Sequence, residues 1–310
     1  MTRPWSESVV WQVLDEYVTR FGISGARPKL ISLRQNGIFH LADHSISVRV
    51  YGPAEHPGRA ALMVQAARWL EAQDFPAVRV SPIPAEQPLD LLGYQVSVWQ
   101  WVRQDDLRPN SAFLYGRLLK RFHSLPGTDA LAVPAFDPVE KIRQRLDRLK
   151  GREIIPAESQ ALLESVYVRA DAMQAELRNS RLGHGIIHGD AMPGNALQRD
   201  GQMVMIDLDS VTFGPREWDL APMAVTAKRF GRRGQAQWPA FLEGYGVEAG
   251  DLADLDAAQM IKQLSMTVYL CLSAGQSPDI DAEIARRLRM WSDGDLDGDW
   301  STAFTVAPTD

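Results

Sequence analysis

The sequence has a single cysteine among its 310 residues and no long apolar run. One cysteine excludes a disulfide framework and a zinc site built from cysteines. Cys271 lies in an apolar stretch, and we expect it to be a small buried hydrophobic residue. The most apolar late stretch, residues 266–271 with their flanks, is much shorter than the roughly 20 residues that cross a bilayer. These absences predict a protein without disulfides and without a membrane span.

Positive charge is in the minority, with 33 Lys and Arg residues against 39 Asp and Glu residues and a net charge of −6. This balance argues against a nucleic-acid-binding surface, and it permits a cationic small-molecule partner. The N-terminal residues lack the apolar stretch of a secretory leader, so we expect a cytoplasmic protein. The hydrophobic fraction of 45% and the charged fraction of 23% are typical of a soluble globular chain with one large or two moderate domains.

Apolar periodicity predicts an α+β organisation, because a mixed first part is followed by a helical second part. The Asn36-Gly37 pair lies between two β-like runs and predicts a hairpin turn. The elements expected in the first part are a helix over 8–21, strands over 29–33, 38–41 and 46–51, a helix opened by Pro57, and a strand over 94–101. The helices expected in the second part span 111–125, 138–150, 157–179, 217–230, 236–245, 252–274 and 279–291.

The chemistry-bearing residues gather between Gly185 and Trp218, where two short apolar runs, 185–187 and 203–206, each end in polar residues. The Asp200-Gly201 pair between the runs is a hairpin signal, so we expect the two polar clusters to fold back beside each other. The clusters are His188, Asp190 and Asn195 after the first run, and Asp207 and Asp209 after the second.

Three of these residues match the needs of phosphoryl transfer. That reaction requires a carboxylate beside the accepting hydroxyl and hard oxygen ligands for Mg²⁺ on the phosphates. Asp190, Asn195 five positions later and Asp207 on the adjoining arm supply this set. The segments HGDAMPGN and IDLDSVTFGPREWDLA resemble the aminoglycoside phosphotransferase and choline kinase-like family of small-molecule kinases.

The resemblance implies a two-lobed protein-kinase-like fold, with a small antiparallel-sheet N-lobe over 1–99, a hinge over 100–103 and a larger, mainly helical C-lobe over 104–310. The nucleotide would lie in the interlobe cleft. The roles that the resemblance implies are catalytic base for Asp190, loop brace for His188, Mg²⁺ ligands for Asn195 and Asp207, and a structural role for Asp219.

The nucleotide-binding residues are expected before residue 103. Arg49 stands where kinases carry a phosphate-contacting lysine, and arginine keeps the charge and can bind phosphate through two hydrogen bonds. Asn36 would take part in covering the nucleotide. Gln100 and Val102 lie in the expected hinge, whose backbone would meet the purine. The glutamate that orients the cation in kinases has two candidates, Glu55 and Glu71, and Asp209 either approaches the metal or caps the turn that follows it.

The sequence therefore predicts an ATP- or GTP-dependent, Mg²⁺-dependent O-phosphotransferase, a monomer or weak homodimer, that acts on an aminoglycoside, amino sugar or related hydroxylated metabolite. A role in antibiotic resistance is one reading. A choline, homoserine or sugar kinase of ordinary metabolism, a nucleotide-binding pseudokinase and a metal-dependent hydrolase using His188, Asp190, Asp207 and Asp209 stay open. Acidic residues beside the late helices would suit a cationic acceptor, although aspartate also serves as a helix N-cap. These residues are Asp251, Asp254, Asp256, Asp279, Asp281 and Glu283.

Overall fold

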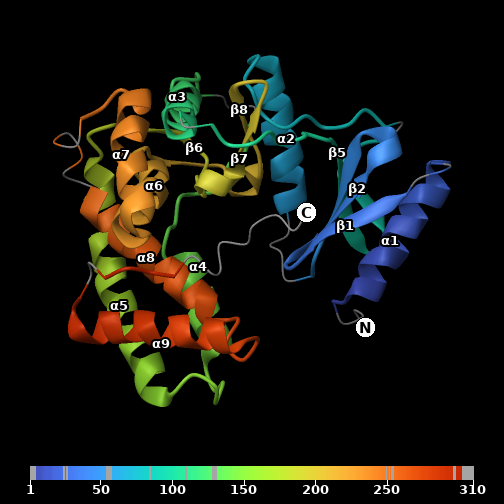
Figure 1. The fold of residues 1–310 in the computed structure, drawn as a ribbon. Coiled ribbons are helices and arrows are strands. Elements are labelled where there is room, and N and C mark those ends of the chain that lie inside the picture. Colours follow the sequence, from blue (N-terminus) through green and yellow to red (C-terminus); the bar gives the residue numbers. More distant parts are fainter. Residues whose placement is uncertain are drawn as a thin grey trace. The chain divides into compact units, whose positions relative to one another are not determined.

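The computed structural model describes residues 5–301 except 24, 26, 54–57, 84, 109, 128–130, 249, 251, 253–254 and 296–297. The chain divides into two compact units (Figure 1). The first unit consists of Met1–Leu107, Thr128–Val133 and Asn195–Val211, and the second of Arg108–Gly127, Pro134–Gly194 and Thr212–Asp310. The lobe and hinge boundaries expected from the sequence stay a prediction.

The first unit is built on a five-stranded antiparallel sheet in the order β1-β2-β3-β5-β4. Alternate residues of a strand point to opposite faces of its sheet. Val48 and Val50 pack in a cluster with helix α1, whereas Arg49 and Tyr51 contact Met63 of helix α2. The two helices therefore cover opposite faces. The elements are α1 (Glu7–Arg20), β1 (Pro28–Leu33), β2 (Asn36–Leu41), β3 (Ile46–Tyr51), α2 (Arg59–Ala72), β4 (Leu89–Leu91) and β5 (Tyr94–Gln100).

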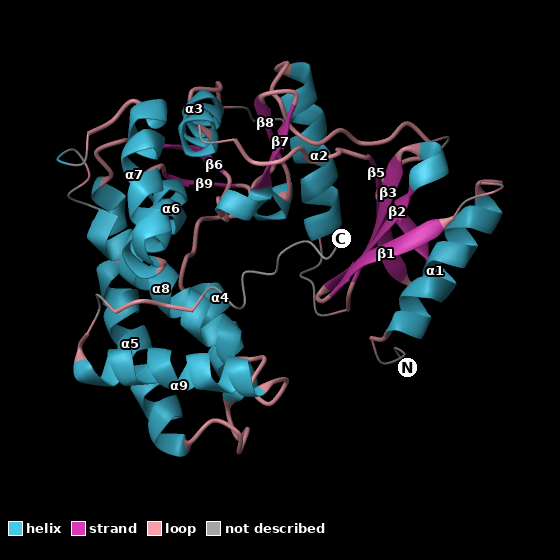
Figure 2. Cartoon of the chain, in the orientation of Figure 1, coloured by secondary structure: helices cyan, strands magenta, loops and turns pink. Residues whose placement is uncertain are grey.

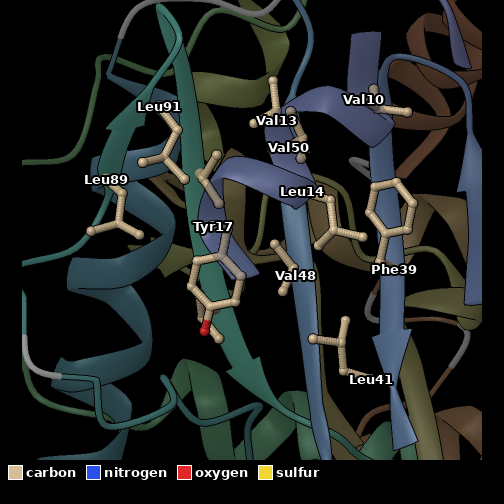
Figure 3. Close-up of a cluster of buried hydrophobic side chains, with 12 residues drawn as sticks. Val10, Val13, Leu14, Tyr17, Phe39, Leu41, Val48, Val50, Leu89 and Leu91 are labelled. Atoms are coloured by element: carbon tan, nitrogen blue, oxygen red, sulfur yellow. The ribbon is translucent and has the colours of Figure 1, made fainter. Parts of the chain in front are cut away.

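The α1 face of the sheet holds the hydrophobic core of this unit. Figure 3 shows Val13, Leu14 and Tyr17 of α1 directed at the strands, where Phe39 and Val48 meet them. This core fixes the position of β3, and with it the neighbouring residues of β3 that point to the other face. Burial also raises the pKa of Tyr17 to about 12.

The turn between β1 and β2 differs from the sequence prediction. Asn36 and Gly37 were expected in the turn, but both lie inside β2, where Gly37 pairs with Leu33. A Cβ on Gly37 would lie only 2.9 Å from Cγ1 of Val10, so the glycine lets α1 pack closely on the strand. The glycine is required for packing rather than for a turn.

The hairpin expected at Asp200-Gly201 is present, between β7 (Ala196–Arg199) and β8 (Gln202–Met205). Asp200 and Gly201 have φ of 51° and 76°, as a two-residue hairpin turn requires. The strand partner of the first apolar run is different, however. β6 (His184–Ile187) pairs with β9 (Thr212–Pro215) in the second unit, because the tight turn pairs only the residues that flank it directly.

The second unit is mainly helical, with α8 packed on α4, α5, α6 and α9, and α3 packed on α7. Figure 2 shows how helices dominate this unit and strands the first. The helices are α3 (Ser111–His123), α4 (Glu140–Leu149), α5 (Ala157–Met173), α6 (Glu217–Arg229), α7 (Gly231–Tyr245), α8 (Leu255–Cys271) and α9 (Pro278–Asp293). Each overlaps a helix expected from the sequence, with ends that differ by a few residues. Among the described residues, no helix has the length and apolarity to span a membrane.

Candidate active site

The loop that carries Asp190 is held in place by a buried aspartate of the same unit. Asp219, on α6, is fully buried, and its two carboxylate oxygens accept the backbone N–H groups of His188 at 2.6 Å and Gly189 at 2.9 Å. His123 of α3 lies 3.0 Å from the same carboxylate through Nε2. A buried carboxylate that accepts several hydrogen bonds is strongly held. Asp219 therefore has the structural position that the sequence suggested for it.

His188, Trp218 and Tyr115 fix the same loop from other directions. The Nδ1 atom of His188 accepts the backbone N–H of Asp190 at 3.3 Å, and the ring is buried. The indole Nε1 of Trp218 donates to the carbonyl of Gly189 at 2.8 Å, and the Tyr115 hydroxyl donates to the carbonyl of Ala191 at 2.6 Å. His188 thus has the contacts of a brace. The loop arrives at Asp190 with its backbone held on both sides.

Asp190 itself is paired with a lysine that sequence reasoning missed. Nζ of Lys262, on α8, lies 2.6 Å from Oδ1 of Asp190, and the Asp190 side chain is 42% exposed. Burial would raise the pKa of this carboxyl, but the positive charge of Lys262 outweighs it and holds the pKa below its usual range. A charged residue within the apolar pattern of residues 255–271 was the available signal.

The first unit holds the other predicted residues, centred on Arg49. The guanidinium of Arg49 donates to Oδ1 of Asp207 at 2.6 Å and to Oδ2 of Asp209 at 2.9 Å. It also lies 5.0 Å from the centre of the Tyr51 ring and 3.3 Å from the Met63 sulfur. Burial opposes the charge of Arg49, but the neighbouring groups, led by Asp207, raise its pKa. The cluster is a buried cation held by two carboxylates.

Asp209, and not a glutamate of helix α2, supplies a carboxylate partner for Arg49. Met63 of α2 contacts Arg49 in the position where a kinase glutamate was expected. Glu71, one of the two glutamates considered, lies 3.8 Å from Arg79, and Glu55, the other, is outside the described residues. The partner of Arg49 therefore comes from the segment after β8, and Asp209 contacts the cation rather than only capping its turn.

The backbone of Asn195 lies next to the backbone that leads into Asp207. The carbonyl of Asn195 accepts the N–H of Ile206 at 3.0 Å, next to Asp207. Asp207 has φ of 58° and ψ of 54°, a left-handed conformation that is uncommon for a residue with a side chain. Such conformations cluster at functional sites because the surrounding structure must impose them. Its side chain is 35% exposed, which leaves room for a further ligand.

These two residues offer oxygen donors that suit Mg²⁺. A magnesium ion in a nucleotide site typically takes one or two protein oxygens and completes its shell with phosphates and water. The Asp207 carboxylate and the Asn195 amide, carried by neighbouring backbone segments, fit that pattern. Within the described ranges, no group of three or more His, Cys, Asp and Glu side chains could hold a metal by itself.

The remaining nucleotide-side residues lie on the sheet and beyond its last strand. Asn36 is buried at the start of β2, and its Oδ1 accepts the N–H of Gly52 at 3.2 Å. Gln100 ends β5, and its backbone N–H donates to Arg79 at 2.9 Å. Val102 follows in an irregular, half-buried segment. The structure ties Asn36 and Gln100 to the protein itself, so their binding roles stay predictions.

The sequence comparison identifies the family. The model of the phosphotransferase enzyme family matches residues 33–261, well over half of the chain and the whole segment from Arg49 to Asp219. This chain belongs to the phosphotransferase enzyme family. No protein of curated function matches the sequence significantly.

Solved structures of small-molecule kinases share the fold of this phosphotransferase. An amicoumacin kinase in complex with AMP-PNP, Ca²⁺ and Ami has a TM-score of 0.71 at 12% identity, with 93% of this chain and 96% of that chain covered. A microcompartment-associated aminopropanol kinase has a TM-score of 0.69 at 18% identity, with 92% and 95% covered. A choline/ethanolamine kinase family protein from Mesorhizobium loti has a TM-score of 0.63 at 17% identity, with 91% and 94% covered.

These matches confirm the predicted α+β, protein-kinase-like fold class and the resemblance to the aminoglycoside phosphotransferase and choline kinase-like family. They also support a small-molecule phosphotransferase with a nucleotide donor. At identities below one fifth, they show the fold and leave the acceptor open.

Proposed function

We propose that this chain transfers the γ-phosphoryl group of ATP or GTP to a hydroxyl group of a small molecule. The observation that carries the proposal is the ionised, half-exposed carboxylate of Asp190, held on a braced loop in a phosphotransferase-family chain. An exposed aspartate on a flexible loop could not orient a substrate. Here the loop backbone is fixed by Asp219 and Trp218, so the carboxylate is preorganised.

In the proposed reaction, the acceptor hydroxyl oxygen forms a bond to the γ-phosphorus. The bond from that phosphorus to the bridging oxygen breaks, and the nucleoside diphosphate leaves with the bonding electrons. Asp190 orients the hydroxyl and receives its proton. Because its carboxyl is a weak base, orientation is the larger part of its contribution.

Mg²⁺, when bound, would neutralise charge on the phosphates, and Asn195 and Asp207 would hold it. Arg49 would steady the phosphates from β3, and Asp209 would keep the guanidinium in place when Asp207 turns to the metal. Asn36, Gln100 and Val102 would contribute to the nucleotide site. This division gives each carboxylate of the segment its own task.

The choice of acceptor class has to come from experiment. Aminoglycosides and amino sugars, expected from the sequence, form one arm of the acceptor panel, together with a role in antibiotic resistance. The similar structures include an amicoumacin kinase and an aminopropanol kinase, so amino alcohols form a second arm. Choline, homoserine and sugars complete the panel for a metabolic kinase.

The hydrolase alternative fits the contacts less well. It needs His188 and Asp209 as metal ligands, but His188 accepts the N–H of Asp190 and Asp209 holds Arg49. A pseudokinase would keep nucleotide binding without transfer. Both alternatives are separated from the proposal by the same measurement.

The test is phosphate transfer by the wild-type chain and by Asp190→Ala, with nucleotide affinity measured in parallel. We expect the variant to lose turnover and to bind Mg-nucleotide nearly as the wild type does. Asp200→Asn, in the exposed hairpin turn, is the matched control and should keep full activity. Undiminished kcat in Asp190→Ala would refute the assignment, and a wild type that binds nucleotide without transfer to any acceptor would indicate a pseudokinase.

A further inference from the structure

Lys262 places a fixed positive charge against the carboxylate of Asp190, which is proposed to orient the acceptor hydroxyl. It lies in the middle of α8, and its side chain is only 7% exposed. Its ammonium group contacts Asp190 at 2.6 Å and lies 5.4 Å from the centre of the Trp218 ring. A buried ammonium is unfavourable unless it is paired, and the carboxylate and the ring together compensate it. The ammonium group of Lys262 is therefore held in a fixed position next to Asp190.

Helix α4 adds further positive charge on the same side. Arg145 donates to the Ser265 hydroxyl of α8 at 2.9 Å, so this face of α4 is turned towards α8. Lys141 precedes Arg145 by one helical turn, so it lies on the same face of α4. The charge of Lys141 also lowers the pKa of the Asp190 carboxyl, by less than the charge of Lys262 does. Two lysines thus bear on one carboxylate.

We propose that the acceptor is a hydroxy acid, with a carboxylate beside the hydroxyl that receives the phosphoryl group. The inference rests on the proposed function. A hydroxyl that reaches the Asp190 carboxylate comes close to the Lys262 ammonium, because the two groups are in contact. A carboxylate on the neighbouring carbon gains a charge-assisted hydrogen bond to that ammonium, whereas an amino group in its place meets a like charge.

Two of the six acidic residues that suggested a cationic acceptor, Asp281 and Glu283, hold other groups of the protein. Asp281 accepts the N–H of Gly275 at 2.8 Å, and Glu283 holds Arg287 at 2.8 Å within the buried part of α9. Asp251 and Asp254 are outside the described residues. The net charge of the whole chain therefore says less about the acceptor than the charge next to Asp190.

The experiment compares acceptors that differ only in the charge beside their hydroxyl groups. One series is glycerate, glycerol and 3-amino-1,2-propanediol, and the other is gluconate, glucitol and 1-amino-1-deoxyglucitol. The wild-type chain with Mg-nucleotide is assayed for kcat/KM with each compound. We expect the acid of at least one series to exceed its amine by about tenfold or more, the ratio that corresponds to 1.4 kcal/mol.

Lys262→Met, which keeps the length of the side chain and removes the charge, should abolish or reverse this order. Lys262→Arg keeps the charge and should retain the order. Lys150→Met is the matched control, because Lys150 is an exposed residue paired with Asp147 at the end of α4. It should leave all the ratios unchanged. If Lys262→Met does not fold, the wild-type order and Lys262→Arg still decide.

The inference is overturned if the wild type prefers the amine of either series, if neither acid is preferred, or if Lys262→Met keeps the wild-type order. Failure of the proposed function looks different. In that case the wild type transfers phosphate to none of these compounds, nor to the aminoglycosides and amino alcohols of the wider panel. Transfer to amino acceptors alone would refute the hydroxy-acid inference and leave the phosphotransferase assignment intact.

Discussion

Replacing Asp219 with asparagine should loosen the Asp190 loop and damage both stability and turnover. The carboxylate accepts two backbone N–H groups, from His188 and Gly189, and one oxygen also faces His123. An asparagine keeps only one acceptor oxygen and points an NH₂ group at a buried donor. The variant therefore loses a charge-assisted hydrogen bond and leaves a buried N–H without a partner.

The magnitude follows from those contacts. A hydrogen bond to a charged group contributes about 1.5–3 kcal/mol, and a buried donor without a partner costs about 1–3 kcal/mol. We expect the free energy of unfolding to fall by about 3 kcal/mol, which lowers Tm by roughly 6–12 °C in a unit of this size. Displacement of the loop by about 1 Å would lower kcat by on the order of 100-fold.

The assay is thermal unfolding together with steady-state phosphate transfer, with Asp200→Asn as the matched substitution in an exposed turn. The control should change neither quantity. An Asp219→Asn protein with the wild-type Tm and the wild-type kcat would show that the buried carboxylate does not hold the loop, and the account of how Asp190 is positioned would be wrong.

Three further predictions follow from the same contacts. Lys262→Met removes the charge that holds the pKa of Asp190 low and leaves the burial that raises it, so the acid limb of the kcat/KM profile should move to higher pH; an unmoved limb in the profile would contradict this. In Arg49→Lys, the ammonium group cannot bridge Asp207 and Asp209 as two nitrogens of the planar guanidinium do. The Kd for Mg-nucleotide, measured by calorimetry, should therefore rise by about tenfold. An unchanged Kd would exclude a phosphate role for Arg49. Burial raises the pKa of Cys271 to about 12, so the folded protein at pH 8 should react with a thiol reagent far more slowly than the unfolded protein, and equal rates would mean that the thiol is accessible.

Much of the architecture was predictable because it depends on local pattern. The helical periodicity of the second half and the Asp200-Gly201 turn are properties of neighbouring residues, and both appear in the structure. The fold class was predictable through the resemblance of the HGDAMPGN and IDLD segments. The hairpin expected around the Asn36-Gly37 pair is present, but the pair lies inside β2, where the glycine allows close packing with Val10 that no local pattern reveals.

The pairing of side chains from distant segments could not be predicted in the same way. Lys262 and Asp190 are separated by 72 residues, and Arg49 and Asp209 by 160. Kinase resemblance directed the search for the partner of Arg49 to a helix glutamate, but α2 presents Met63 there and a carboxylate from another segment takes the place. Such pairs depend on how the chain packs.

The most direct test of the central claim is the fate of the γ-phosphate when the wild-type chain is incubated with Mg-nucleotide and the acceptor panel. Product analysis by mass spectrometry and ³¹P NMR distinguishes a phosphomonoester of the acceptor from inorganic phosphate. We predict a single phosphomonoester with the wild type and none with Asp190→Ala. Release of inorganic phosphate alone, or the same phosphomonoester at the same rate from Asp190→Ala, would contradict the claim that Asp190 directs phosphoryl transfer to a hydroxyl group.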